Sequence, residues 1–164
     1  MQLLAALITI APLVGFQSGA AKTSPAYGLM VSSERSIGRE LDVVAIDQQT
    51  RTRDDTARVN VLYVQIGGRY VFDPAARLRP YIGGTVGATR ADVGGAVHLS
   101  PSGALGAGAD VQLAKNVALR LDGRVHVTFG GNTTLECSSE GACSGSTSSG
   151  FSQFVASAGL AFRF

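Results

Sequence analysis

The chain has 164 residues, enough for one domain, with 45% hydrophobic residues, 16% charged residues and 21 glycines. This mixture is too apolar and too poor in charge for a disordered chain. Beyond the N-terminus it contains no run of the about 20 apolar residues that a membrane-spanning helix needs. The net charge of +2, with dispersed basic residues, argues against a nucleic-acid partner.

The first twenty residues allow two interpretations. Residues 7–19 alternate apolar and small or polar side chains, which predicts a first strand and leaves residues 1–6 as an N-terminal extension. The alternative is a signal peptide over residues 1–20, ending in the small residues Ser-Gly-Ala. No basic residue precedes Lys22, and Pro12 interrupts the apolar run. Cleavage would also leave an odd number of strands, so we favour the strand.

Period-two alternation along the rest of the chain predicts seven more strands. They cover residues 25–33, 39–50, 59–72, 78–90, 102–113, 116–129 and 152–164. The clearest is NVALRLDGRVHVTF at 116–129, whose odd positions are apolar and whose even positions carry most of its charge. Most of these strands exceed the ~5–6 residues typical of soluble proteins. They reach the ~9–11 residues that cross a bilayer at a tilt.

The connectors between the predicted strands alternate in length. Three are short turns, at residues 35–40, 73–79 and 113–116, and three are longer, at residues 51–57, 91–98 and 130–150. The connector at 19–24 belongs to the long side but is short. Short turns at one end and long loops at the other are typical of outer-membrane barrels. We therefore predict an all-β protein, an eight-stranded antiparallel up-and-down transmembrane β-barrel over residues 7–164.

Alternation alone does not decide which face points outward, so a soluble lipocalin-like binder with an apolar interior is an alternative. Two observations favour the membrane. The polar face is rich in Gly, Ala, Ser and Thr with few charges, which suits the narrow interior of an eight-stranded barrel. The apolar face has aromatic ends at Tyr70, Phe72, Phe129 and Phe162, as an interfacial girdle requires.

The polar face also carries the charges expected to line the barrel interior. They are Arg69, Arg79, Asp110, Arg120, Asp122, Arg124, His126 and Arg163. Basic residues outnumber acids in this set, which points to an anion-facing lumen. Because an eight-stranded barrel is too narrow for an open channel, we expect a paired network that plugs the interior. Asp110 and Asp122 should each lie beside an arginine.

No catalytic signature stands above a structural explanation. His126 and Thr128 are similar to the His/hydroxyl pair of membrane-embedded lipid A deacylases, but those enzymes use serine and their pair faces lipid. We interpret His126 as a member of the interior network. The only other histidine is His98, so neither a multi-histidine metal site nor a cofactor is expected. Cys137 and Cys143 enclose five residues and predict a small disulfide loop in an oxidising compartment.

One stretch of the chain resembles a known family. GGRYVFDPAARLRPYIGGTVGATR looks like the turn and flanking strands of small bacterial outer-membrane β-barrel proteins, the OmpA/OmpX-like superfamily. The matching residues are Gly68, Arg69, Tyr70, Phe72, Arg79, Pro80, Tyr81, Gly83 and Gly87. Gly84-Thr85 departs from the commoner alternating small residues of that family. The C-terminal ASAGLAFRF is similar to the closing strand of the same family.

The resemblance implies a monomer in a bacterial outer membrane, in contact with membrane lipid and lipopolysaccharide. It also implies that Phe164, supported by Phe162 and Leu160, is part of the signal that the barrel-assembly machinery reads. A non-enzymatic structural or surface-interaction role, with displayed extracellular loops, is the function we expect. The alternatives are a narrow channel for small solutes and an outer-membrane lipid-modifying enzyme.

Overall fold

The computed structural model describes residues 8–19, 23–51, 58–93, 96–130, 133–137, 143–147 and 150–164. No helix within these ranges is long and apolar enough to span a membrane. The described residues form ten strands. They are β1 (Ile8–Gly19), β2 (Ser24–Ser36), β3 (Arg39–Arg51), β4 (Arg58–Val71), β5 (Leu78–Val93), β6 (Ala96–Ala114), β7 (Val117–Thr128), β8 (Thr133–Cys137), β9 (Cys143–Thr147) and β10 (Phe151–Arg163).

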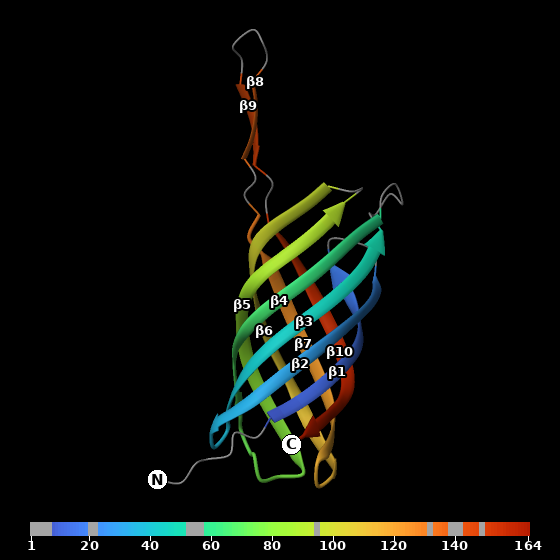
Figure 1. Cartoon of the computed structure of the whole chain (residues 1–164), viewed down its shortest axis with the longest axis vertical. Coiled ribbons are helices and arrows are strands. Elements are labelled where there is room, and N and C mark those ends of the chain that lie inside the picture. The colour runs from blue at the N-terminus through green and yellow to red at the C-terminus, as the bar shows by residue number, and fades with distance from the viewer. Residues whose placement is uncertain are drawn as a thin grey trace.

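Eight of these strands close into an antiparallel barrel in which each strand pairs with its neighbour along the chain, and β10 returns to β1 (Figure 1). One row of cross-strand partners, followed around the wall from Gln153, meets β10 again at Arg163. This stagger of ten residues tilts the strands against the barrel axis. Closure leaves no unpaired sheet edge, which a wall in contact with hydrocarbon requires. The predicted fold class is confirmed.

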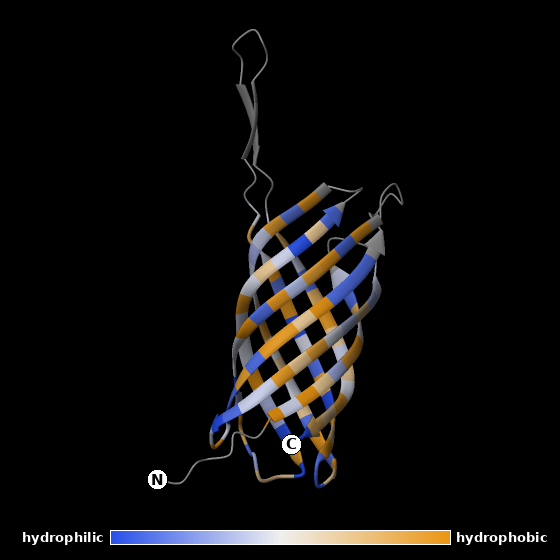
Figure 2. Ribbon diagram, in the orientation of Figure 1, coloured by the Kyte–Doolittle hydropathy of each residue, from blue (hydrophilic) through white to orange (hydrophobic). Residues whose placement is uncertain are grey.

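The apolar face of the strands points outward. On β7, Arg120, Asp122 and Arg124 are buried while Leu121 and Val125 are exposed. Figure 2 shows hydrophobic and hydrophilic residues alternating along the strands of the wall. A strand that runs ten residues at ~3.3 Å each, tilted by about 40°, spans about 25 Å, the height of the apolar band of a membrane barrel. The soluble lipocalin-like alternative is therefore wrong.

Aromatic side chains lie at both ends of the apolar surface. Tyr70, Phe72 and Phe162 are exposed at the end of the barrel where β1 begins and β10 ends, which we call the terminal end, and Phe129 is exposed near the opposite end (Figure 1). The rings of Tyr70 and Phe72 contact each other edge to face, with centroids 5.3 Å apart. This arrangement is the interfacial girdle that the sequence predicts.

All eight predicted barrel strands are present, and the largest difference in their bounds is at β6. We predict a long loop over residues 91–98, and this is wrong. The ladder between β5 and β6 continues through Asp92–Val97 to Val93–Ala96, so the hairpin extends further than its sequence pattern. The prediction failed because small and polar residues interrupt the period-two pattern there. The backbone hydrogen bonds of a ladder do not require such a pattern of side-chain hydropathy.

The connector between β7 and β10 contains a hairpin of its own. Strands β8 and β9 pair with each other and extend beyond the barrel at the end opposite the termini (Figure 1). Cys137 and Cys143 are cross-strand partners at the end of this ladder that is farther from β7 and β10. Their side chains lie outside the part of the chain that the structure describes, so the disulfide stays a prediction.

Strand β1 is a full member of the barrel, because it pairs with β2 on one side and with β10 on the other. Residues 1–6, which we predict to be an N-terminal extension, lie outside the described residues. Loss of residues 1–20 would remove β1, but whether the chain is cleaved there stays open as a prediction.

Candidate functional site: the barrel interior

Charged side chains meet inside the barrel, mostly in the half nearer the termini. Arg79, Asp110 and Arg120 lie within a few residues of the short turns that join β4 to β5 and β6 to β7. Asp122 and Arg124 lie further along β7. All five side chains are buried inside a barrel whose outer surface is apolar. Buried charges need partners of opposite charge to offset the loss of hydration.

Asp110 is held by two arginines. Arg120, which is completely buried, donates from Nε to Asp110 Oδ1 at 2.8 Å and from Nη2 to Oδ2 at 2.9 Å. Arg79 Nη2 lies 3.4 Å from Asp110 Oδ2. The Arg120 pair is bidentate, the arrangement in which a guanidinium and a carboxylate interact most strongly.

Asp122 is paired on its own strand. Arg124 Nε donates to the two carboxylate oxygens of Asp122 at 2.7 and 3.0 Å. The Tyr81 hydroxyl donates to Asp122 Oδ1 at 3.1 Å. Both carboxylates on the predicted polar face therefore lie beside an arginine. The residues on one face of a strand are two apart, which is why Asp122 and Arg124 meet.

The opposite wall supplies two carboxylates that sequence reasoning missed. Arg69 donates to Glu40 Oε2 from both Nε, at 2.9 Å, and Nη2. Arg69 also donates to the Ser32 hydroxyl at 3.0 Å and lies 3.6 Å from Asp42. Asp42 in turn lies 3.9 Å from Arg124, which links the two walls. The alternation of Glu40 and Asp42 with Leu41 and Val43 is the signal that could have found them.

The structure therefore adds two acids, Glu40 and Asp42, to the charges predicted for the interior. Four arginines meet four carboxylates, so this cluster has no net charge. We call Arg69, Arg79, Arg120 and Arg124, with Glu40, Asp42, Asp110 and Asp122, the interior network. A balanced network favours neither anions nor cations.

Uncharged side chains fill the gaps within the interior network. Met30 Sδ lies 3.0 Å from Arg120 Nη1 and 3.5 Å from Arg69 Nη1. The ring of Tyr81 lies 4.8 Å from the guanidinium carbon of Arg69, within cation–π range. Tyr81 fits against the wall only because residue 108 is glycine: a Cβ there would lie 2.5 Å from the Tyr81 hydroxyl.

Neutral polar groups line the interior beyond the network, toward the end that carries β8 and β9. Tyr63 Oη donates to Gln153 Oε1 at 2.8 Å, and its ring lies 4.6 Å from that of His126. Within the described ranges neither nitrogen of His126 has a hydrogen-bond partner. Thr128 instead lies 3.3 Å from Thr89, oxygen to oxygen. His126 and Thr128 therefore form no activated hydroxyl pair.

No protein-family model and no curated protein sequence matches the chain. Solved structures do match. Neisserial surface protein A aligns at 16% identity over 97% of both chains, with a TM-score of 0.69. The N-terminal β-barrel domain of Pseudomonas aeruginosa OprF aligns at 16% identity over 96% of this chain and 97% of that chain, with a TM-score of 0.61. Outer membrane protein W of E. coli aligns at 15% identity over 99% of this chain and all of that chain, also with a TM-score of 0.61.

The chain has the fold of the small outer-membrane β-barrels. In this outer-membrane fold, the residues predicted to form the assembly signal all point away from the interior. Leu160 and Phe162 are exposed on β10, Phe164 is exposed directly after it, and the backbone of Phe164 bonds to that of Ile8 where the barrel closes. Their role in assembly stays a prediction. Arg163, which we placed in the lumen, is half-buried at the rim beside the β4–β5 turn. It is the cross-strand partner of the buried Thr9 and lies near enough to Arg79 for the two charges to repel each other.

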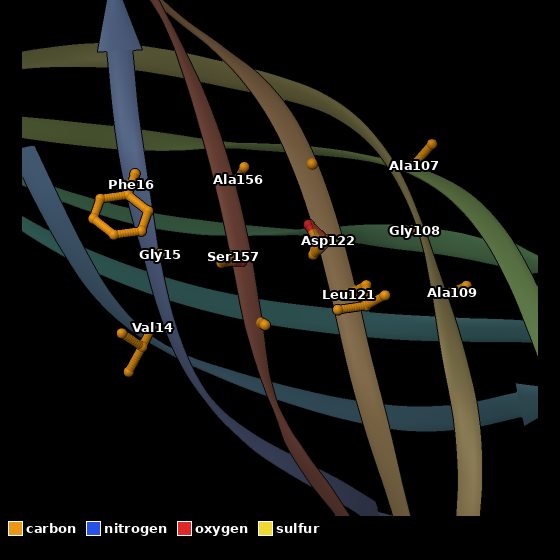
Figure 3. Close-up of a pocket in the computed structure, with 12 residues that line it drawn as sticks. Val14, Gly15, Phe16, Ala107, Gly108, Ala109, Leu121, Asp122, Ala156 and Ser157 are labelled. Carbon is orange, nitrogen blue, oxygen red and sulfur yellow. The ribbon is translucent and has the colours of Figure 1, made fainter. Parts of the chain in front are cut away.

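The outer wall of this membrane barrel has a shallow recess, which Figure 3 shows with the residues that line it. Ala156, Gly123 and Ala107 are consecutive cross-strand partners on β10, β7 and β6, so three small residues lie side by side. The exposed side chain of Phe16, the partner of Ala156 on β1, bounds the row. The recess faces outward, so in a bilayer lipid chains would fill it.

Proposed function

We propose that the protein is a non-enzymatic β-barrel of a bacterial outer membrane that displays extracellular loops in a structural or surface-interaction role. The observation that carries the proposal is the interior network. Arg120 and His126 are completely buried, and Arg69 and Arg124 are each only 4% exposed. An interior filled with buried side chains favours a barrel that anchors loops and argues against one that conducts solutes.

The β8–β9 hairpin is the surface that such an anchor would present. It lies in the longest connector and extends from the end of the barrel opposite the termini (Figure 1). The long loops of outer-membrane barrels are extracellular and their short turns are periplasmic. One protein of the same fold, Neisserial surface protein A, is by its name a surface protein, which is in keeping with this proposal.

The membrane topology of the β8–β9 hairpin tests directly whether the hairpin lies on the cell surface. An epitope tag inserted between Cys137 and Cys143 should bind antibody on intact cells. The matched control is the same tag next to Lys115 in the β6–β7 turn, which should bind only after the outer membrane is permeabilised. If the control tag is accessible on intact cells and the hairpin tag is not, the orientation is reversed and the proposal fails.

A conductance measurement distinguishes the surface-display role from a role in solute transport. The purified barrel in a planar bilayer should give no unitary current steps, because the buried side chains of the interior network occupy the lumen. Reproducible steps that disappear with a heat-unfolded sample would instead support the narrow channel. For the lipid-modifying enzyme, the test is lipid A composition, which should be the same in cells that lack the protein and in cells that overproduce it.

A further inference from the structure

The terminal end of the barrel has an uneven distribution of exposed charge. Four cations are exposed in and beside its short turns: Arg35, Arg39, Arg77 and Lys115. Asp73 is the one exposed acid among the described turn residues at this end. The surface of this end is therefore basic, although the interior network behind it is neutral.

Two of these cations flank the β2–β3 turn. Arg35 lies at the irregularity between Glu34 and Ser36, where the alternation of β2 is interrupted, and its side chain is exposed. On β3, Arg39 lies on the face of the exposed Val43, opposite to that of the buried Asp42. Arg35 and Arg39 thus flank the tight β2–β3 turn on the outer surface of the barrel.

Aromatic and aliphatic side chains lie beside these two arginines. Arg39 is the cross-strand partner of Tyr70, and Tyr70 packs edge to face against Phe72. Ile37, at the tip of the turn, is 85% exposed. The row of cross-strand partners continues from Tyr70 to the exposed Ile82 of the apolar band. Arg39 therefore lies where the apolar surface ends.

The turn that carries the arginines is held in place by its backbone. Gly38 adopts φ 74°, a conformation that favours glycine, and its carbonyl accepts a hydrogen bond from Val71 N at 2.7 Å. Among the described residues neither Arg35 nor Arg39 has an ion-pair partner. The nearby Glu40 is turned inward and bonded to Arg69. The two guanidinium groups are thus free to bind an external anion.

We propose that Arg35, Ile37, Arg39, Tyr70 and Phe72, the turn patch, bind an anionic phospholipid of the membrane leaflet at the terminal end. The guanidinium groups bind the phosphate, as arginine does when a planar donor pair is needed. Tyr70, Phe72 and Ile37 contact the glycerol and upper acyl region, where interfacial aromatic residues lie. A second positive group repels the ammonium of a zwitterionic headgroup, so the site selects a net negative lipid. This inference needs only the transmembrane fold and is independent of the surface-display role.

Native mass spectrometry of the folded barrel tests the turn patch. The protein is released from mixed micelles that contain phosphatidylglycerol and phosphatidylethanolamine in equal amounts, and retained lipids are counted. We expect selective retention of phosphatidylglycerol, and about 30-fold weaker binding in the Arg35→Gln/Arg39→Gln variant, from roughly 5-fold for each arginine. The matched control is Arg90→Gln, which removes an exposed cation near the opposite end of β5 and should leave binding unchanged.

A photoactivatable phosphatidylglycerol locates the site independently of any variant. Cross-links should fall in peptides that contain residues 35–39 or 70–72. They should diminish from 0.05 to 0.5 M salt, about the range in which surface charge becomes screened, and should persist when inorganic phosphate replaces chloride at the same ionic strength. Equal retention of the two lipids, cross-links spread evenly around the barrel, or an equal loss in Arg90→Gln would each overturn the proposal. If inorganic phosphate competes, the site is a simple anion site and the lipid assignment is wrong.

Discussion

The bidentate pair between Arg120 and Asp110 offers a quantitative test of the interior network. In Arg120→Met, Asp110 loses hydrogen bonds of 2.8 and 2.9 Å and keeps only Arg79, at 3.4 Å. In Asp110→Leu, both arginines lose their shared carboxylate. Removing one partner of a buried pair costs about 3–5 kcal/mol. We expect Arg120→Met near the lower end of that range and Asp110→Leu near the upper end, because it leaves two cations uncompensated.

The double variant Arg120→Met/Asp110→Leu distinguishes the energy of the ion pair from the energy of side-chain packing. It removes the buried charges together, so it should be at least about 2 kcal/mol more stable than the sum of the single effects. Arg77→Met is the control, because Arg77 is exposed and donates one long hydrogen bond, 3.4 Å, to the Gln112 carbonyl. Its stability should change by less than about 0.5 kcal/mol.

The assay is equilibrium unfolding by urea of barrels folded into lipid vesicles. The chain has no tryptophan, so far-ultraviolet circular dichroism and the gel mobility of unboiled samples report folding. Single variants that each cost less than about 1 kcal/mol, or a double variant whose cost equals the sum, would refute the reasoning. Either result would mean that the network contributes shape to the interior but little electrostatic stabilisation.

Three further predictions concern single positions. Gly108→Ala places a Cβ 2.2 Å from the Leu121 carbonyl oxygen and 2.5 Å from the Tyr81 hydroxyl, and should cost about 1–3 kcal/mol. Gly68→Ala, whose nearest neighbour would be 3.4 Å away, should cost under about 0.5 kcal/mol by the same urea titration; equal costs would contradict the close approach. Phe164→Ala should lower the amount of folded protein in the outer membrane of cells and leave refolding in detergent unchanged, because the exposed side chain is expected to act in recognition; an equal defect in both assays would mark a structural role. His126→Phe should keep the contact with Tyr63 and leave stability equal or higher, because no described residue bonds the ring nitrogens; a loss above about 1 kcal/mol would mean that the imidazole has a partner there.

The period-two alternation of side chains in the sequence predicted most of the fold. Side chains of a strand alternate between its two faces, so the alternation of Arg120, Asp122 and Arg124 with Leu121 and Val125 predicts both the strand and the contents of each face. The same reasoning failed at the top of β5 and β6, where ladder hydrogen bonds extend the hairpin without an alternating pattern. It also passed over Glu40 and Asp42, which lie in a strand whose pattern is weaker.

What the sequence by itself determined is therefore the number of the barrel strands, their alternation and the arginine-rich composition of one face. The tertiary structure decided which residues meet across the interior, because the stagger of ten residues brings together positions far apart in the chain. Arg69 and Glu40 are already cross-strand partners in the β3–β4 hairpin, but Arg124 on β7 reaches Asp42 on β3 only in the closed barrel. Partnership across a barrel depends on stagger and closure, which no single strand encodes, and so the neutral interior network became visible only in three dimensions.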